Sequence, residues 1–250
     1  MKMPWESYLT PVKMFGNLYF IGTYDASTHL IDTGEGLILI DPGYQESVYL
    51  VVNNIWELGF KPTDIKYILI SHGHIDHFGG TRELASLSGA KTFIGREDLN
   101  AVSEFFTPDY LIDDGDEIKL GNTVIKCVHT PGHTDGTISF FFDVSDGKNV
   151  FRAGMHGGAG TNTLTKKYLI ENNLPLSNRQ KFLDGIEKVR KEKVDIFVGN
   201  HAWNNHTDIK IPKLLAGEKN VFIDESEWEK YLNERKGRMM QVIEEEKERI

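Results

Sequence analysis

The segment Ser71-His72-Gly73-His74-Ile75-Asp76-His77-Phe78-Gly79-Gly80 holds four residues able to bind a metal ion within six positions. It directly follows Tyr67-Ile68-Leu69-Ile70, an apolar run typical of a buried central strand. In extended backbone, residues i and i+2 project to the same side, so a loop after this strand can direct the first two histidines toward one metal ion. The aspartate and the third histidine, where the chain turns into the next helix, can face a second metal ion.

Two further histidines follow other expected strands. His133 ends Thr130-Pro131-Gly132-His133, where Pro and Gly suit the central positions of a type II turn. His201 follows the expected strand 196–199. Imidazole and carboxylate donors favour zinc, with manganese, iron and cobalt as alternatives. Because these donors lack the cysteines common in closed structural zinc sites, three protein ligands per metal would leave positions open for water, as in catalytic zinc sites.

The remaining histidines are interpreted as ordinary buried or surface residues. His156 and His206 are kept as candidate pocket-lining residues, because a glycine-rich and an asparagine-rich loop hold them. Asp41 precedes Pro42 and Gly43 and has two interpretations of equal weight: a turn residue, or an acceptor that orients a ligand imidazole. The aromatic segment 105–110 is interpreted either as a pocket wall or as ordinary core packing.

The rest of the chain predicts an α/β protein. Expected strands are 18–23, 29–33, 37–41, 67–70, 91–94, 118–120, 124–128, 138–144, 149–152 and 196–199. Expected helical segments are 48–58, 78–87 and an amphipathic stretch at 183–194. No linker rich in Pro, Ser or Gly divides the sequence, so we expect one domain over 1–250, with a C-terminal helix of about 225–250 docked on it.

Charge and cysteine content restrict the function classes. The 28 basic residues are outnumbered by 37 acidic ones, for a net charge of −9, so binding to nucleic acid or to anionic membranes is not expected. The start, 1–6, shows no signal peptide, and no later run has the apolar length of a membrane span. We expect a cytoplasmic protein as the sequence stands, or a periplasmic or secreted one if a signal peptide was removed. The single cysteine, Cys127, permits no internal disulfide and is expected to be a small buried residue.

The segment 71–80 resembles the signature of the metallo-β-lactamase superfamily, and Asp41-Pro42-Gly43 resembles its companion motif. The resemblance continues through 130–136 and 194–201, and its spacing is most similar to the third subclass (B3) of metallo-β-lactamases. It implies an αββα sandwich of two mixed sheets flanked by helices. It also implies a binuclear site with two Zn²⁺ ions, the first held by His72, His74 and His133, and the second by Asp76, His77 and His201.

The chain departs from related subclasses after the strand 149–152. Glyoxalase-like and lactonase-like members place a metal-bridging aspartate there, where this chain has Ala153-Gly154-Met155. The first lactamase subclass uses a cysteine ligand near the same place, and Met155 cannot supply a thiolate. Both departures favour the third subclass. The serines with which that subclass often binds the substrate carboxylate are replaced by the run 155–160. Donors for a carboxylate are instead sought among Asn162, Thr163, Lys166, Lys167, Asn204 and Asn205.

The resemblance implies a hydrolase that opens β-lactams or another cyclic amide or ester, and with it a role in antibiotic resistance. Two close zinc ions supply an activated hydroxide, and Asp76, as a catalytic residue as well as a ligand, is placed to orient it. The alternatives are a zinc hydrolase of lactones, thioesters or phosphoesters and, more distantly, a metal-binding scaffold without catalysis. A di-iron oxidoreductase would show a glutamate in place of His74, and a nuclease would show added basic segments; neither feature is present. The oligomeric state is left open.

Overall fold

Two β-sheets pack face to face in the computed structural model, which describes residues 3–247. The strands of the first sheet, in spatial order, are β1 (Val12–Phe15), β2 (Leu18–Phe20), β3 (His29–Asp32), β4 (Leu37–Ile40), β5 (Ile65–Ile70), β6 (Lys91–Gly95) and β7 (Tyr110–Ile112). Those of the second sheet, in spatial order, are β12 (Ile196–Phe197), β11 (Val150–Met155), β10 (Ile138–Ser145), β9 (Thr123–His129) and β8 (Glu117–Leu120). Both sheets are mixed, because β4 to β7 pair in parallel and β11 pairs in parallel with β12, whereas the other neighbours are antiparallel.

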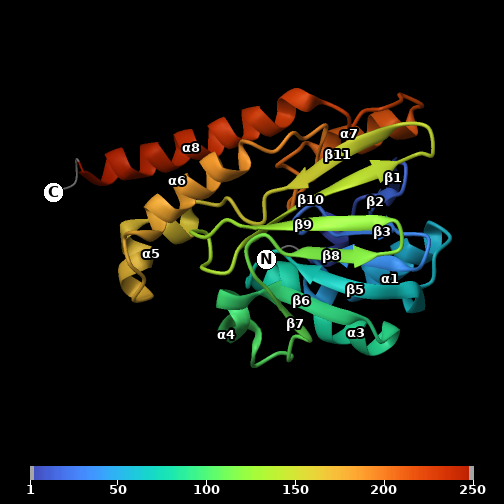
Figure 1. Cartoon of the computed structure of the whole chain (residues 1–250), viewed down its shortest axis with the longest axis horizontal. Helices are drawn as coiled ribbons and strands as arrows, with labels where there is room; N and C mark the ends of the chain where they lie inside the picture. Colours follow the sequence, from blue (N-terminus) through green and yellow to red (C-terminus); the bar gives the residue numbers. More distant parts are fainter. Residues whose placement is uncertain (1–2, 248–250) are drawn as a thin grey trace.

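Helices cover the outer faces of the two sheets. Their bounds are α1 (Val48–Glu57), α2 (Ile75–Phe78), α3 (Thr81–Ser88), α4 (Leu99–Val102), α5 (Lys166–Glu171), α6 (Asn178–Val189), α7 (Thr207–Leu215) and α8 (Glu225–Lys247). Figure 1 shows α6 and α8 on one side of the strands and α1 and α3 on the other. The expected αββα sandwich is therefore confirmed.

Three apolar clusters account for this layering. One lies between the sheets and includes Phe20, Phe140 and Phe142, all fully buried. The second joins the outer face of the first sheet to residues of α1 and α3. The third joins the second sheet to α6 and α8. Cys127 lies in the apolar cluster between the two sheets as a free, buried residue, as its sequence context predicts.

Several expected boundaries are wrong. The segment 78–87 is not one helix but the end of α2 and most of α3, because the Gly80 N–H donates to the Gly43 carbonyl, 2.9 Å away, and not to a carbonyl one helical turn back. The amphipathic stretch at 183–194 begins earlier and ends earlier, as α6, whose buried Phe182, Ile186 and Val189 recur at helical spacing. Strands β1 and β7 and helices α5 and α7 were not predicted.

The expected C-terminal helix is present as α8, and the final residues of the predicted range, 248–250, lie outside the described part of the chain. Trp228, Leu232 and Met239 are buried against the second sheet and α6. The Trp228 indole N–H donates to the Val189 carbonyl at the end of α6, 3.3 Å away. Helix α8 is thus packed as part of the same core and does not project from it.

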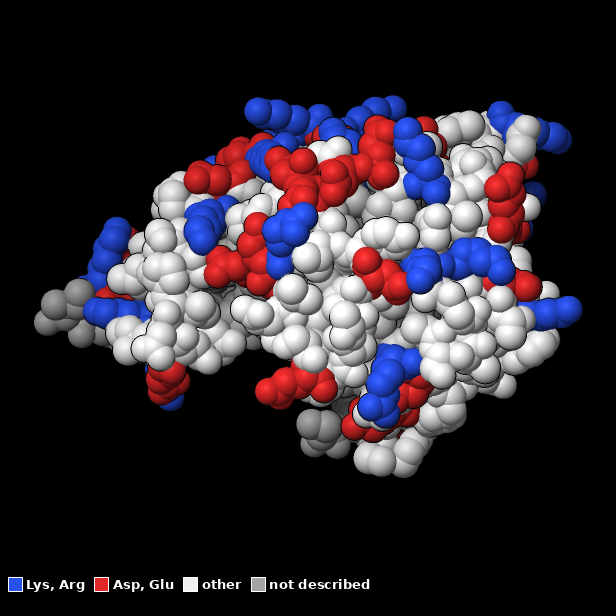
Figure 2. Space-filling model, turned by 60° about the horizontal axis from the view of Figure 1, so that its bottom comes forward, with Lys and Arg blue, Asp and Glu red and all other residues white. Residues whose placement is uncertain are grey.

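The charged surface is mixed in sign. On the face drawn in Figure 2, the lysines and arginines alternate with acidic side chains and do not form one continuous basic surface. Within residues 3–247, no helix is both long enough and apolar enough to span a bilayer.

Replacing Leu232 with alanine tests how much α8 contributes to stability. Because this side chain is fully buried, Leu232→Ala is expected to lower the free energy of unfolding by about 2–5 kcal/mol. Urea denaturation followed by circular dichroism measures the change. Leu215→Ala is the matched control, since Leu215 is 62% exposed, and its effect should stay within about 0.5 kcal/mol. Equal effects of the two substitutions would contradict the packing described for α8.

Candidate metal centre

Six side chains converge where strands of both sheets end. The chain leaves β5 into the loop that carries His72 and His74 and then into α2, which carries Asp76 and His77. The remaining two follow β9 and β12 and are His133 and His201. Their nitrogen and oxygen atoms form two groups of three, with the atoms of each group within 4.8 Å of one another: His72, His74 and His133 in the first cluster, and Asp76, His77 and His201 in the second cluster. The division matches the one that the family resemblance implies.

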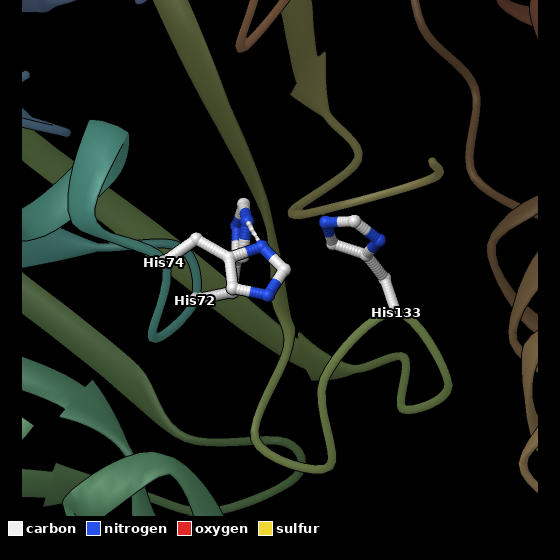
Figure 3. Close-up of side chains that lie close together, drawn as sticks. All are labelled: His72, His74 and His133. Atoms are coloured by element: carbon white, nitrogen blue, oxygen red, sulfur yellow. Dashed lines mark hydrogen bonds between the residues drawn. The ribbon is translucent and has the colours of Figure 1, made fainter. Parts of the chain in front are cut away.

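The first cluster consists of three imidazoles that point toward one another (Figure 3). His72 Nε2 lies 3.1 Å from His74 Nδ1. The Ser71 hydroxyl donates to Asp41, so its oxygen is free to accept from His72 Nδ1, 3.1 Å away. His133 Nδ1 donates to the Gly160 carbonyl at 2.9 Å. These bonds place the protons of His72 and His133 on Nδ1, which leaves both Nε2 lone pairs available to a metal ion.

The second cluster combines two imidazoles with a carboxylate. His77 Nδ1 donates to Asp41 Oδ2 at 2.8 Å, and His201 Nδ1 donates to the Asp25 carbonyl at 2.6 Å. The buried His77 Nε2 lacks a hydrogen-bond partner among the described residues, although it lies 3.1 Å from Asp76 Oδ2. His201 Nε2 lies 4.0 Å from the same oxygen. The free ring nitrogens therefore face the Asp76 carboxylate.

The pKa values of the first-cluster histidines and of His77 are shifted in opposite directions. Burial, reinforced by the neighbouring histidines, lowers the pKa of His72 well below its usual value, and burial lowers the pKa of His133 to about 3. Burial also acts to lower the pKa of His77, but Asp41 and Asp76 outweigh it and raise that pKa above its usual value. The first cluster thus offers neutral imidazoles, whereas a metal ion at the second cluster must displace a proton.

Asp41 contacts the second cluster directly and reaches the first cluster through Ser71. Its Oδ1 accepts the Ser71 backbone N–H and its Oδ2 accepts the Ser71 hydroxyl, each at 2.7 Å, in addition to the bond from His77. It is fully buried and has a positive φ of 53°, a conformation that aspartate adopts more readily than most residues. Of its two interpretations from the sequence, the structure favours the acceptor that orients ligand imidazoles.

Asp98 joins the two loops that carry the first cluster, and sequence reasoning missed it. Its Oδ2 accepts from the Gly73 N–H and from the Thr134 hydroxyl, each at 2.7 Å, and its Oδ1 accepts from the Gly136 N–H at 2.8 Å. Burial raises the pKa of Asp98 in spite of these bonds. The position lies in an ordinary Arg-Glu-Asp-Leu stretch, so no local signal distinguishes it.

The glycine-rich run after β11 packs directly on the first cluster. A Cβ at Gly158 would lie 2.6 Å from His133 Cδ2, and a Cβ at Gly160 would lie 3.0 Å from His133 Cε1. A larger residue at Gly158 would therefore require the His133 ring to shift, and one at Gly160 would crowd the same ring.

A cavity of about 490 Å³ opens beside both clusters, within the range of small-molecule sites. Its wall includes Asn162, Thr163 and Asn204, which were proposed as carboxylate donors, but not Lys166 or Lys167. Additional lining residues that the sequence did not single out are Tyr168, Trp203, Tyr231 and Arg235. The cavity thus extends from the clusters to α8.

Other sequence-based candidates lie elsewhere. Asn205 is buried, and its amide nitrogen donates to the Phe197 carbonyl at 2.9 Å, so it does not face the cavity. The segment 105–110 is absent from the described cavity wall, and Phe105 packs on Phe78 with ring centroids 5.1 Å apart. His156 is buried beside the wall, and His206 lies on the rim of a different, smaller hollow.

The donor set fits metal ions of intermediate hardness. Five imidazoles and one carboxylate, without thiolate, suit zinc or a similar divalent ion. The unpartnered, buried His77 Nε2 is an independent sign, because a buried polar nitrogen normally has a partner. Three donors per cluster would leave coordination positions for water or substrate.

The comparison with protein families gives the class of this protein. A family model described as the metallo-β-lactamase superfamily matches residues 21–148, just over half of the 250-residue chain. The chain belongs to the metallo-β-lactamase superfamily, which is a family of metal-dependent hydrolases.

Solved structures of subclass B3 enzymes resemble the whole chain. The native FEZ-1 metallo-β-lactamase from Legionella gormanii superposes with a TM-score of 0.90 at 28% identity, covering 99% of each chain. The class B3 di-zinc metallo-β-lactamase LRA-12 from an Alaskan soil metagenome gives a TM-score of 0.87 at 28% identity, covering 96% of this chain and 97% of that one. The resemblance to subclass B3 expected from the motifs is confirmed.

Several of the curated proteins that match this chain by sequence are named hydroxyacylglutathione hydrolases and not β-lactamases. A hydroxyacylglutathione hydrolase from Buchnera aphidicola is 30% identical over 127 residues, which cover 50% of this chain and 47% of the relative. A probable hydroxyacylglutathione hydrolase from Schizosaccharomyces pombe is 30% identical over 135 residues, which cover 53% and 49%. The chain spans about half the length of the curated relatives that it matches.

The substitution Asp41→Asn is expected to weaken metal binding at both clusters, by roughly tenfold to a hundredfold each. The reason is that the Asp41 carboxylate orients His77 directly and His72 through Ser71. Ser71→Ala should weaken the first cluster only. Titration with cobalt(II) in competition with a chromophoric chelator measures both affinities. Asp32→Asn is the control, since the Asp32 carboxylate accepts from the Gly34 N–H and from neither cluster. An effect of Asp41→Asn confined to the second cluster would exclude the contact through Ser71.

Proposed function

We propose that this protein is a binuclear zinc hydrolase that opens the amide bond of β-lactams. In this proposal His72, His74 and His133 hold one zinc ion, and Asp76, His77 and His201 hold the other. When bound, the two ions supply Lewis acidity for the scissile carbonyl and a water molecule of lowered pKa as the nucleophile. Antibiotic hydrolysis, and resistance as its consequence, would follow from this activity.

The residues of the chain provide orientation and charge for this reaction. The Nδ1 bonds of His72, His77, His133 and His201 fix the tautomers and ring planes of the proposed ligands. The Asp76 carboxylate faces both His77 and His201, and its pKa is held below its usual range mainly by its contacts with His77, which outweigh burial. It therefore remains an anion able to accept a hydrogen bond from an attacking water. No serine or cysteine nucleophile is required.

The observation that carries the proposal is the division of the six side chains into two groups of three, in a chain that matches the FEZ-1 metallo-β-lactamase over 99% of both lengths. The end of β11 adds support. Met155 stands there, fully buried, and Ala153 and Gly154 precede it, so this strand offers no bridging carboxylate of the kind that glyoxalase-like enzymes use.

Thioester hydrolysis is the second candidate. It is favoured by the curated relatives named hydroxyacylglutathione hydrolase, which share up to about half of their length with this chain. It would use the same two clusters and the same cavity, because the attacked group is again a carbonyl. The two candidates differ in the substrate that the cavity must accept, and a comparison of turnover separates them.

Metal content tests the assignment of the ligands. Zinc-loaded protein is expected to contain close to two zinc equivalents, since the six ligands divide three and three, and to lose hydrolytic activity with chelator and regain it with zinc. His133→Ala should mainly reduce occupancy of the first cluster and His201→Ala that of the second. Inductively coupled plasma mass spectrometry after dialysis measures this. Full occupancy in both variants would remove these residues from the ligand set.

Turnover by the zinc-loaded protein tests the reaction itself. Penicillins, cephalosporins and carbapenems are compared with a hydroxyacylglutathione and with a phosphodiester. We expect loss of the lactam chromophore, insensitive to reagents that acylate serine lactamases, because no serine nucleophile is present to react. Asp76→Asn is the inactive control and should lower turnover by about a hundredfold. Intact lactams beside a hydrolysed thioester would replace the first candidate by the second.

A further inference from the structure

Arg235 is the only lysine or arginine among the described residues that line the cavity beside the two clusters. It comes from α8, far along the chain from the loops that carry the histidines. Its Nε atom is buried and lacks a hydrogen-bond partner among the described residues. Its Cζ lies 5.5 Å from the centre of the Tyr231 ring, which also lines the cavity. The guanidinium group is thus held at the cavity wall with a donor unused.

The ion pair between Arg235 and Glu234 does not explain why the Arg235 guanidinium group lies at the cavity wall. Its Nη2 atom contacts the carboxylate of Glu234, the preceding residue of α8. The Glu234 side chain is 66% exposed, and pairs with a solvated partner contribute little. The pair also leaves Nε without a partner. This cavity-lining guanidinium group therefore keeps a positive charge and an unpaired N–H donor, and both suit an anionic ligand.

A second unused donor lies next to the same wall. His156 is buried, its ring centroid is 6.5 Å from that of Tyr231, and its Nδ1 accepts the Gly158 N–H at 3.3 Å. Burial, with the nearby charge of Arg235, lowers the pKa of His156 to about 4, so the ring is neutral near pH 7 and carries its proton on Nε2. This Nε2 is buried without a partner among residues 3–247. One unused N–H donor therefore lies on the cationic Arg235 at the cavity wall, and a second lies on the neutral His156, buried beside the wall residue Tyr231.

The distribution of charge within the cavity indicates what these donors bind. Apart from the histidines, Asp76 and Arg235 are the only charged side chains among its described lining residues. Asp76 lies with the metal clusters, and Arg235 lies on the α8 wall. The chain as a whole carries a net charge of −9, so a cation in the cavity wall stands out from its surroundings. The position of Arg235, apart from the metal clusters, matches a substrate that carries a negative group at a distance from the bond that is cleaved.

We propose that Arg235 binds the carboxylate of the substrate and thereby makes this enzyme selective for anionic substrates. This proposal rests on the proposed function, because it assumes that the cavity holds the molecule to be hydrolysed. The carboxylate can belong to a bicyclic β-lactam or to the glutathione part of a thioester. Both present the same chemistry to Arg235, and they differ in the bond that is broken.

Matched pairs of charged and uncharged ligands test this proposal on the zinc-loaded protein. Turnover is measured on benzylpenicillin and its methyl ester, and on an S-acylglutathione and its dialkyl ester. Binding of S-hexylglutathione, a thioether that cannot be hydrolysed, and of its diethyl ester is measured by isothermal titration calorimetry. The variants are Arg235→Ala, Arg235→Lys and, as the matched control, Arg238→Ala, because Arg238 is exposed on the same helix and contacts Gln241.

For Arg235→Ala we expect KM for whichever charged substrate is hydrolysed to rise about tenfold to a hundredfold, with kcat within about threefold of wild type. The esters should respond little to the substitution. Lysine should restore part of the lost affinity, since it supplies charge without the paired donors. Arg238→Ala should behave as wild type. Thermal unfolding of each variant separates these effects from a loss of α8 packing, which would alter charged and uncharged ligands equally.

The proposal is overturned by equal KM changes for a charged substrate and its ester, or by S-hexylglutathione affinity unchanged by Arg235→Ala. Absence of measurable binding by any carboxylate ligand to the wild-type protein would overturn it as well. Failure of the proposed function is a separate result. In that case the protein hydrolyses neither lactam nor thioester and still binds S-hexylglutathione, but not its ester, in a manner that depends on Arg235. That result would support the carboxylate site and contradict the proposed reaction.

Discussion

The contact of the buried Asp41 carboxylate with Ser71 and His77 is the constraint on which the candidate metal centre depends. The carboxylate accepts two hydrogen bonds from Ser71 at the end of β5 and one from His77 at α2. Placing a full charge out of contact with water is costly unless its oxygens are hydrogen-bonded, so these donors cannot move away without a penalty of several kcal/mol. The same bonds hold the loop between them, with the histidines that it carries, in one conformation.

Close approach of backbone to side chains fixes the remaining ligands. Asp98 binds backbone N–H groups of both Gly73 and Gly136, which brings the loop after β5 against the loop after β9. A Cβ at Gly136 would lie 2.4 Å from the Asp98 backbone nitrogen, so this contact requires glycine. Gly158 lies equally close to the His133 ring. The first cluster therefore results from three segments packed without space for larger residues.

The second sheet and α8 then determine the shape of the cavity beside the clusters. The six candidate ligands follow β5, β9 and β12, whereas the far wall of the cavity comes from α5 and α8. Helix α8 is fixed by the burial of Trp228 and Leu232 in the third apolar cluster. The far wall of the cavity is thus linked to the packing of a helix that carries none of the candidate ligands.

The sequence by itself determined the fold class and the six candidate ligands, for a local physical reason. An apolar run followed at once by histidines at i and i+2 specifies both a buried strand and the direction of its first polar side chains. Glycine and proline likewise marked the turn before His133. What only the tertiary structure decided is the role of residues that act across the fold. Asp98, Tyr231 and Arg235 lie in ordinary stretches of chain. Asp98 binds Gly73, 25 positions away, and Tyr231 and Arg235 reach the cavity only through the packing of α8. Their burial, unused donors and contacts exist only once the two sheets and α8 have packed together, because hydrogen-bond partners and desolvation are properties of the assembled core and not of local sequence.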